Sequence, residues 1–299
     1  MKKILIIGCG LLGSSLVRKI SKKKIANKIF IYEKSKSNIT KIKKLNLPVT
    51  IVKTLNDSIV NIDLIIFCTP MSEYKGLILK INKFISSKTL ITDIGSSKIA
   101  SSKIIKKFLK KNIHWISSHP ITGSEVSGPE HGKENLFENK WCILIKDKRI
   151  NIKFLKVLVS FWKKVGSKTV IMSAEKHDKI FSITSHLPHL VAYNLVKSAQ
   201  DLEKIQKFDL IKYSAGGLRD FSRIAASNEI MWRDIFFDNS QNISKAIDIF
   251  VKNLKDFKKD INLKKNKSII GKLIRAKKVR SKILKLKQDI NKPDFGRSN

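Results

Sequence analysis

The sequence predicts an α/β fold, with a doubly wound N-terminal domain over residues 1–172 and an all-helical domain over residues 173–299. Short apolar runs alternate with helical patterns in the first half, which is typical of strand–helix repeats. Several of these runs, such as "KILIIG" and "LIIFCT", are apolar throughout, as parallel strands covered on both faces are. After about Ser173 the apolar residues recur with helical spacing and few strand signals.

The predicted strands of the N-terminal domain belong to one open sheet. They are Lys3–Ile7, Ile29–Glu33, Val49–Val52, Leu64–Thr69, Thr89–Asp93, His114–Ser118, Cys142–Ile145 and Thr169–Met172. Helical patterns such as Ser14–Lys23 and Ile99–Lys111 separate them. Alternation of this kind predicts a largely parallel sheet with helices on both faces.

The opening residues "MKKILIIGCGLLGSSLV" allow two interpretations, an export signal or a strand that runs into a glycine-rich turn. We favour the strand, because only about five apolar residues precede Gly8, fewer than the ~7–15 of a signal peptide. No apolar run approaches the ~18 residues that span a bilayer. The three cysteines lie far apart without a CxxC pair, so we expect neither a disulfide framework nor a zinc cluster, and a reducing, cytoplasmic location.

The formal net charge of +37 raises the question of a nucleic-acid partner. The excess is mostly lysine and is spread through every segment, and no nucleic-acid-binding motif accompanies it. A solvated lysine-rich surface therefore explains the charge better, and we expect neither nucleic acid nor a membrane as a partner. A basic NAD-sensing or nucleic-acid-binding protein remains the alternative outside the enzymes.

Gly8, Gly10 and Gly13 form a G-x-G-x-x-G pattern between the first strand and the first helix. In a Rossmann-type domain the first glycine permits the tight turn, the second lets a pyrophosphate approach the backbone, and the third lets helix and strand pack closely. The backbone N–H groups at the start of the helix, around Leu11 and Leu12, then face the phosphates. The pattern predicts a dinucleotide site.

Glu33 ends the next strand, 20 residues after Gly13, where a carboxylate accepts hydrogen bonds from the ribose hydroxyls. It would repel a 2′-phosphate, so we expect NAD rather than NADP. Lys34 and Lys36 lie close and partly offset that preference. A tight turn followed by a surface glutamate is the alternative.

Further candidate residues follow the later strands. Thr69 and Pro70 end the strand after the second crossover, where ligands of such sheets bind, although a plain strand-ending turn has the same pattern. Ser96 brings a hydroxyl to the same edge, or caps a helix. His119, in "SSHPITG", is the histidine best placed after a strand to take a proton from a substrate hydroxyl, and a structural histidine is the alternative. Glu125 in its loop is either a cap or a supporting group.

Two motifs of the helical domain carry further candidates. His186 and His189 flank Pro188 at the start of an apolar helix, but no third ligand is evident, so we predict no metal. Arg219 and Arg223 lie at i and i+4 on one helical face, either to hold a carboxylate or to form surface ion pairs.

Together these motifs resemble the prephenate/arogenate (cyclohexadienyl) dehydrogenases. The segments that carry the resemblance cover both domains, in the order GCGLLGSSL, IYEKS, DIGSSK, SHPITGSEVSGPE, LFENKWCIL, SHLPHLVA and GGLRDFSRIAASN. The nearest enzyme alternative is a β-hydroxyacid-type oxidative decarboxylase, which usually relies on a catalytic lysine.

The resemblance implies NAD-dependent oxidative decarboxylation of a cyclohexadiene, which makes the precursor of tyrosine or tyrosine itself. It implies that His119 is the catalytic histidine, that Ser96 orients it, and that Arg223 holds the ring carboxylate. Arg219, Glu125, His186 and His189 would line the substrate pocket. A homodimer formed through the helical domain is implied as well. The sequence does not decide between prephenate and arogenate.

Overall fold

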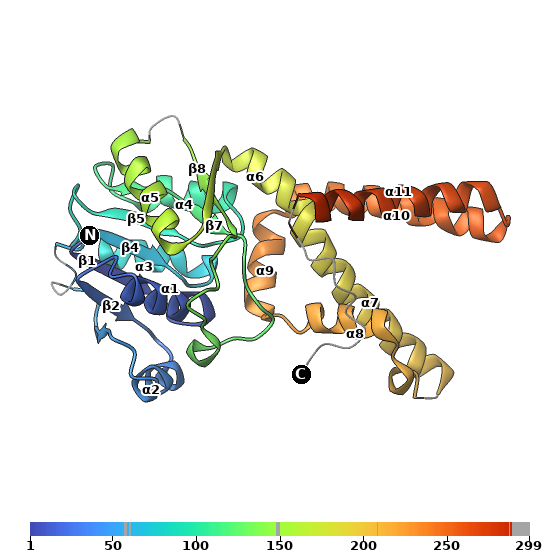
Figure 1. Cartoon of the computed structure of the whole chain (residues 1–299), viewed down its shortest axis with the longest axis horizontal. Helices are drawn as coiled ribbons and strands as arrows, with labels where there is room; N and C mark the ends of the chain where they lie inside the picture. Colours follow the sequence, from blue (N-terminus) through green and yellow to red (C-terminus); the bar gives the residue numbers. More distant parts are fainter. Residues whose placement is uncertain (57–58, 60, 148–149, 208, 287, 289–299) are drawn as a thin grey trace.

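A six-stranded parallel sheet forms the centre of the N-terminal half (Figure 1). The structure, a computed structural model, describes the chain apart from residues 57–58, 60, 148–149, 208, 287 and 289–299. The strands are β1 (Lys3–Ile7), β2 (Lys28–Tyr32), β3 (Thr50–Ile51), β4 (Leu64–Phe67), β5 (Leu90–Asp93) and β6 (His114–Trp115). Their order across the sheet is β3-β2-β1-β4-β5-β6, and each pair is parallel. The predicted doubly wound arrangement is confirmed, and the strand order reverses beside β1.

Helices cover both faces of this sheet. On one face lie α1 (Leu11–Lys22), α2 (Lys36–Lys44) and α5 (Ile152–Val165), and on the other lie α3 (Tyr74–Ile81) and α4 (Ile99–Phe108). The side chains of β1 pack alternately against the two layers of helices. Ile4 and Ile6 lie on the side of α1, α2 and α5, and Leu5 and Ile7 lie on the side of α3 and α4. All four are fully buried. A strand buried on both faces has no polar side, which is why it reads as an unbroken apolar run.

The strands after β6 do not extend this sheet, so the expectation of one sheet is wrong. They are β7 (Ser118–Pro120), β8 (Trp141–Ile145) and β9 (Lys168–Met172). They form a separate sheet in which β7 is antiparallel and β9 parallel to β8. The backbone N–H of Ile116 still bonds to Ile91, whereas the carbonyl of Ser117 accepts from Ile145. The predicted strand His114–Ser118 is therefore divided between two sheets.

The described secondary structure after β9 is helical, as predicted. It comprises α6 (Ala174–Phe181), the π-helical turn η4 (Ser182–His186), α7 (Leu187–Gln206), the 3-10 turn η5 (Ile211–Tyr213), α8 (Gly216–Ala225), α9 (Glu229–Asp238), α10 (Ser240–Asn262) and α11 (Asn266–Lys285). In Figure 1, α7 with α8 and α10 with α11 form two arms that extend away from the N-terminal half. None of the described helices combines the length and apolar character needed to cross a membrane. That residues 1–172 and 173–299 are separate units stays a prediction.

Helix α9 returns from the helical half to the N-terminal half. Trp232 is buried in the same apolar cluster as the helices α3 and α4. The carboxylate of Asp234 accepts a hydrogen bond from the backbone N–H of Ser72, just after β4, at 3.0 Å. The carboxylate of Asp238 accepts one from the hydroxyl of Ser97, just after β5, at 3.2 Å. Through these contacts α9 holds the loops that follow β4 and β5.

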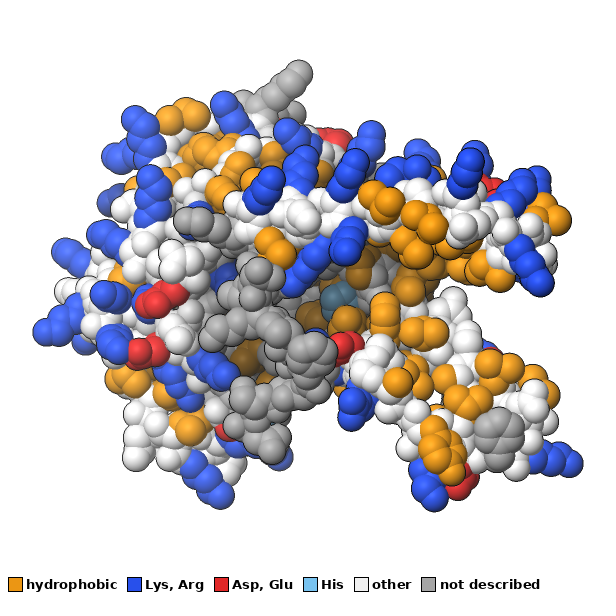
Figure 2. Space-filling view, turned by 45° about the vertical axis from the view of Figure 1, so that its right-hand side comes forward, with side chains coloured by type: hydrophobic (Ala, Val, Ile, Leu, Met, Phe, Trp, Pro, Cys, Tyr) orange, Lys and Arg blue, Asp and Glu red, His pale blue; other side chains and the backbone are white. Residues whose placement is uncertain are grey.

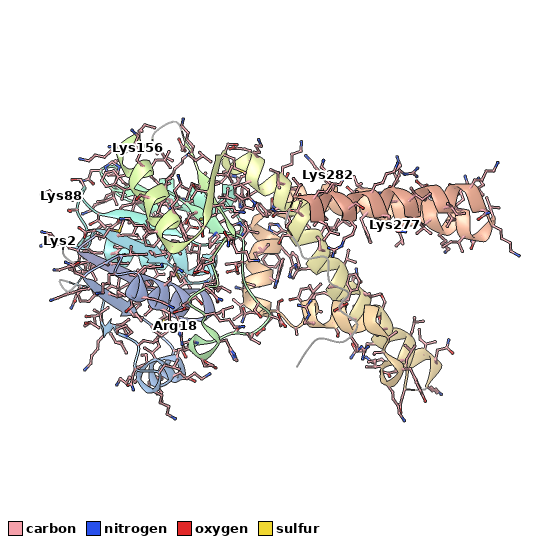
Figure 3. All side chains as sticks on the ribbon, viewed as in Figure 1. Lys2, Arg18, Lys88, Lys156, Lys277 and Lys282 are labelled. Atoms are coloured by element: carbon pink, nitrogen blue, oxygen red, sulfur yellow. The ribbon has the colours of Figure 1, made fainter. Side chains whose placement is uncertain are left out.

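The lysine excess is spread over the surface. Figure 3 labels Lys2, Lys88 and Lys156 on the N-terminal half, and Lys277 and Lys282 on α11 in the arm that extends away from it. Figure 2 shows the same on one face, where basic side chains stand singly over the N-terminal half and along α10 and α11. This pattern is that of a solvated surface rather than of one basic patch.

Candidate active site

The turn between β1 and α1 has the backbone shape that a phosphate site requires. Gly8 has a φ of +90°, and a Cβ there would lie 2.6 Å from the carbonyl oxygen of Cys68. A Cβ on Gly13 would lie 2.3 Å from the carbonyl oxygen of Gly8, so α1 approaches the turn more closely than a side chain permits. A Cβ on Gly10, by contrast, would meet no atom within 4 Å. The open side of the turn is therefore at Gly10.

The start of α1 offers hydrogen-bond donors on that open side. The helix begins at Leu11 and Leu12, and within the described part of the chain no side chain caps it and no acidic residue lies in its first turn. A helix N-terminus carries partial positive charge and free N–H groups, so it attracts an anion. The turn thus fits the pyrophosphate of a dinucleotide.

Glu33 follows β2 and lies directly beside this turn. One carboxylate oxygen accepts a hydrogen bond from the backbone N–H of Cys9 at 2.8 Å, and the other from that of Ser35 at 2.9 Å. Lys34 forms its ion pair with Glu73 instead of with Glu33. The carboxylate is therefore held in place, half-buried, where the ribose hydroxyls of a dinucleotide lie in this fold.

Thr69 lies against the other side of the glycine turn. A Cβ on Gly8 would lie 2.8 Å from the Thr69 methyl group, so the two residues are in contact. The Thr69 hydroxyl is buried and has no hydrogen-bond partner among the described residues. Pro70 precedes the 3-10 turn η2 (Met71–Glu73) and is exposed. An unpaired buried hydroxyl beside the turn is consistent with a polar ligand there.

His119 lies within the strand β7, so the expectation that it follows a strand is wrong. Its Nδ1 is 2.7 Å from Nε2 of His177, in α6. The Nδ1 of His177 in turn is 2.7 Å from a carboxylate oxygen of Asp178. His177 and Asp178 are fully buried and His119 is 8% exposed. The three side chains form a continuous hydrogen-bonded row that begins at the predicted catalytic residue.

A buried ion pair lies beside this row. The Nζ of Lys98 donates to a carboxylate oxygen of Asp93 at 2.6 Å and to the carbonyl of Ser118 at 2.7 Å. Asp93 also accepts from the hydroxyl of Tyr74 at 3.1 Å and from the indole N–H of Trp115 at 3.2 Å. Both charged side chains are fully buried. A pair with this many partners holds a fixed ammonium group directly behind β7.

The histidines of the site are held uncharged. Burial lowers the pKa of His119 well below its usual range, and His177, Lys98 and His186 lower it further. Burial lowers the pKa of His177 to about 2 and that of His186 to about 4. These shifts favour the neutral form of all three rings, and a neutral imidazole has a lone pair that can accept a proton.

The structure brings Ser96 and His186 to the same region as His119. The backbone of Ser96 lies close enough to the His186 ring to raise its pKa, against the effect of burial. The Nδ1 of His186 lies 3.1 Å from the side-chain nitrogen of Asn239. His189 is one helical turn further on, stacked on Trp232 with ring centroids 3.8 Å apart.

The structure also brings Glu125 and Arg223 together. Their charged atoms are 3.7 Å apart, and both side chains remain partly accessible, at 31% and 42%. Arg223 and Arg219 lie on α8, as the spacing predicts, and Arg219 is exposed. The Glu125–Arg223 pair thus joins the loop after β7 to the helical half.

Sequence reasoning missed three residues of this region, Lys98, His177 and Asp178. Each lies in or next to a segment that carried other signals: Lys98 ends "DIGSSK", and "HD" at 177–178 falls in an amphipathic helical pattern. Among the described residues, no group of three or more His, Cys, Asp or Glu side chains is arranged to hold a metal ion.

Two family models match this chain. The one described as prephenate dehydrogenase, nucleotide-binding domain, matches residues 16–171, and the one described as prephenate dehydrogenase, dimerization domain, matches residues 173–275.

Curated relatives and solved structures agree with these matches. A cyclohexadienyl dehydrogenase of Zymomonas mobilis is 32% identical over 254 residues, covering 85% of this chain and 86% of the relative. A prephenate dehydrogenase of Bacillus subtilis is 30% identical and covers 84% of this chain and 68% of the relative. A prephenate dehydrogenase of Aquifex aeolicus, solved with hydroxyphenyl propionate and NAD+, superposes with a TM-score of 0.88 at 33% identity, covering 95% of this chain and 98% of that one. The chain belongs to the prephenate dehydrogenase family, whose members are NAD-dependent oxidoreductases.

Proposed function

We propose that this chain catalyses the NAD-dependent oxidative decarboxylation of prephenate, arogenate or both, in tyrosine biosynthesis. The observation that carries the proposal is the buried His119 in β7, whose neighbour Ser118 bonds to the carbonyl of Asp93 at the end of β5, in the sheet that bears the dinucleotide turn. A histidine of lowered pKa acts as a base at neutral pH without first losing a proton.

Bound NAD supplies the hydride acceptor in this chemistry. His119 accepts the proton of the ring hydroxyl as the hydrogen on the same carbon leaves with its electron pair. The C–C bond to the ring carboxylate then breaks, carbon dioxide departs, and the bonding electrons complete the aromatic ring. His119 returns its proton to the phenolic oxygen. Arg223 binds the substrate carboxylate, which it can do with two parallel hydrogen bonds.

The remaining residues divide between cofactor and substrate. Around the cofactor, the glycine turn and the start of α1 hold the phosphates, Glu33 the ribose, and Thr69 and Pro70 border the nicotinamide. Around the substrate we place Ser96, Arg219, Glu125, His186 and His189. Glu33 supports NAD over NADP, because a 2′-phosphate would meet its carboxylate.

We also infer that the chain works as a homodimer in the cytoplasm. Exposed apolar side chains recur along α10 and α11, among them Ile249, Leu254, Ile261, Leu273 and Val279. Figure 2 shows such side chains facing the space between the two arms. A partner copy would bury them. The thiols of Cys9, Cys68 and Cys142 are free, which is consistent with a reducing compartment.

The test is to follow NADH formation with prephenate and with arogenate, each with NAD and with NADP. We expect turnover with at least one of the two cyclohexadienes and a higher kcat/KM with NAD. Absence of turnover with both substrates and both cofactors contradicts the proposal, and a preference for NADP contradicts the role of Glu33.

A further inference from the structure

Among the described residues, the His119 ring forms a hydrogen bond through one of its two nitrogens. Its Nδ1 is bonded to His177, as described above, whereas no hydrogen bond of its Nε2 is present among the described residues. A neutral imidazole carries one proton, so one nitrogen donates and the other accepts. Which nitrogen carries the proton decides whether His119 can accept a proton from a substrate.

Asp178, at the end of the row His119–His177–Asp178, determines which ring nitrogens of the two histidines carry protons. One carboxylate oxygen of Asp178 accepts the backbone N–H of Lys98 at 2.8 Å, and the other accepts that of Ile99 at 2.9 Å, at the start of α4. Burial raises the pKa of the Asp178 carboxyl, and these two donors oppose that shift by stabilising the ionised form. An ionised carboxylate can only accept hydrogen bonds. The proton between Asp178 and His177 must therefore be on Nδ1 of His177.

The position of the proton on His177 in turn determines the position of the proton on His119. With its proton on Nδ1, neutral His177 presents a lone pair on Nε2. That lone pair accepts a hydrogen bond, so the proton between the two rings is on Nδ1 of His119. The Nε2 of His119 is then left with a lone pair. This is the tautomer that a proton acceptor requires.

We propose that His177 and Asp178 are positioning residues that fix His119 in the tautomer with an unprotonated Nε2. This inference rests on the proposed function for its catalytic meaning, but the tautomer itself is a property of the protein without substrate. When His119 takes a proton on Nε2, its Nδ1–H still donates to His177, so the hydrogen bond between the two rings is kept.

The other titratable groups around His119 do not fix the tautomer. Lys98 and His186 face it, and both disfavour its charged form. Lys98 is neutralised by Asp93, its partner in the buried ion pair. The hydrogen bond to His177 is the contact that distinguishes the two nitrogens of His119.

The test compares two variants, His177→Gln and His177→Phe, which differ in whether the side chain can accept a hydrogen bond. The glutamine keeps a side-chain oxygen that can accept from Nδ1 of His119, whereas phenylalanine keeps a ring of similar size and accepts nothing. The tautomer is read by long-range 1H–15N NMR on protein labelled with 15N-histidine, with the His119 signals identified from their absence in His119→Asn. Steady-state kcat and KM are measured alongside.

In the wild type we expect His119 to carry its proton on Nδ1. The His177→Phe variant should lose this preference and lower kcat at least about tenfold with KM changed less, and His177→Gln should restore both the tautomer and most of kcat. A proton on Nε2 of His119 in the wild type overturns the inference, even if the variants fail to fold. Equal kcat losses in both variants also overturn it, because they would indicate packing rather than hydrogen bonding. The NMR result holds or fails without turnover, so it is distinguishable from a failure of the proposed function.

Discussion

Two alanine substitutions in the glycine turn should separate cofactor binding from folding. In Gly10→Ala the new methyl group meets no protein atom within 4 Å, and Gly10 does not have the positive φ that disfavours a side chain. In Gly13→Ala the methyl group would lie 2.3 Å from the carbonyl oxygen of Gly8, well inside contact distance. Gly10→Ala therefore fills the space in which we place the pyrophosphate, whereas Gly13→Ala disturbs the packing of α1 on β1.

The expected magnitudes follow from these distances. Relieving the Gly13→Ala overlap requires a backbone shift, and overpacking of this kind costs about 1–3 kcal/mol. For a chain of this size that corresponds to a melting temperature lower by roughly 2–5 °C. Gly10→Ala should leave the melting temperature nearly unchanged. It should weaken NAD binding about tenfold to a hundredfold, because a charge-assisted hydrogen bond contributes about 1.5–3 kcal/mol.

The assays are thermal unfolding without ligand and titration of NAD by calorimetry. Gly76→Ala is the matched control, since a Cβ there also meets nothing within 4 Å but lies on the exposed side of α3. It should leave NAD binding unchanged and raise the melting temperature by about 1–2 °C, because alanine favours a helix by about 1 kcal/mol over glycine. If Gly10→Ala binds NAD as tightly as the wild type does, the phosphates do not lie on the open side of this turn and the cofactor placement is wrong.

Three further predictions concern the substrate site and its pH dependence. His119→Asn should lower kcat by about 10²–10⁴-fold with KM within a few-fold, and an unchanged kcat would remove its role as the base. Arg223→Ala should raise KM for the cyclohexadiene by at least about tenfold, and Arg219→Ala by less; the reverse order would exchange their roles. The pKa of His186 is lowered to about 4 in the folded protein, so an unfolded chain binds its proton first and stability falls as the pH drops from about 6.5 to 4. The loss is at most about 3 kcal/mol for this group, so urea unfolding of His186→Gln should show a flatter pH profile, and equal profiles would contradict the shift.

Long apolar patterns account for what could be predicted of the fold. Strand β1 and its glycine turn are readable because burial on both faces removes every polar residue from Lys3–Ile7 except at its start. The second sheet was not predictable, because β7 has three residues, includes Pro120, and carries no periodic signal. The chain's passage from one sheet to the other depends on contacts between distant segments.

The candidate site also contains residues that the sequence could indicate and residues that it could not. His119 and Arg223 stand in motifs that the sequence shows directly, so sequence reasoning could propose them as candidates. His177 and Asp178 could not be named, because their importance depends on the approach of α6 to β7, which no local pattern encodes. Lys98 is hidden for a related reason: a lysine after a serine-rich turn reads as a surface residue, and only its contact with Asp93 reveals that it is buried.

The return of α9 has a consequence for anyone who recombines members of this family. A junction after Met172 looks natural, since β9 ends there and the helices begin. Yet Asp234 and Asp238 bond to residues just after β4 and β5, and Trp232 completes an apolar cluster of the N-terminal half. A hybrid joined at Met172 would therefore pair the α9 of one parent with the loops of the other. Residues of α9 should be inherited together with the loops they hold, although more than a hundred residues separate them along the chain.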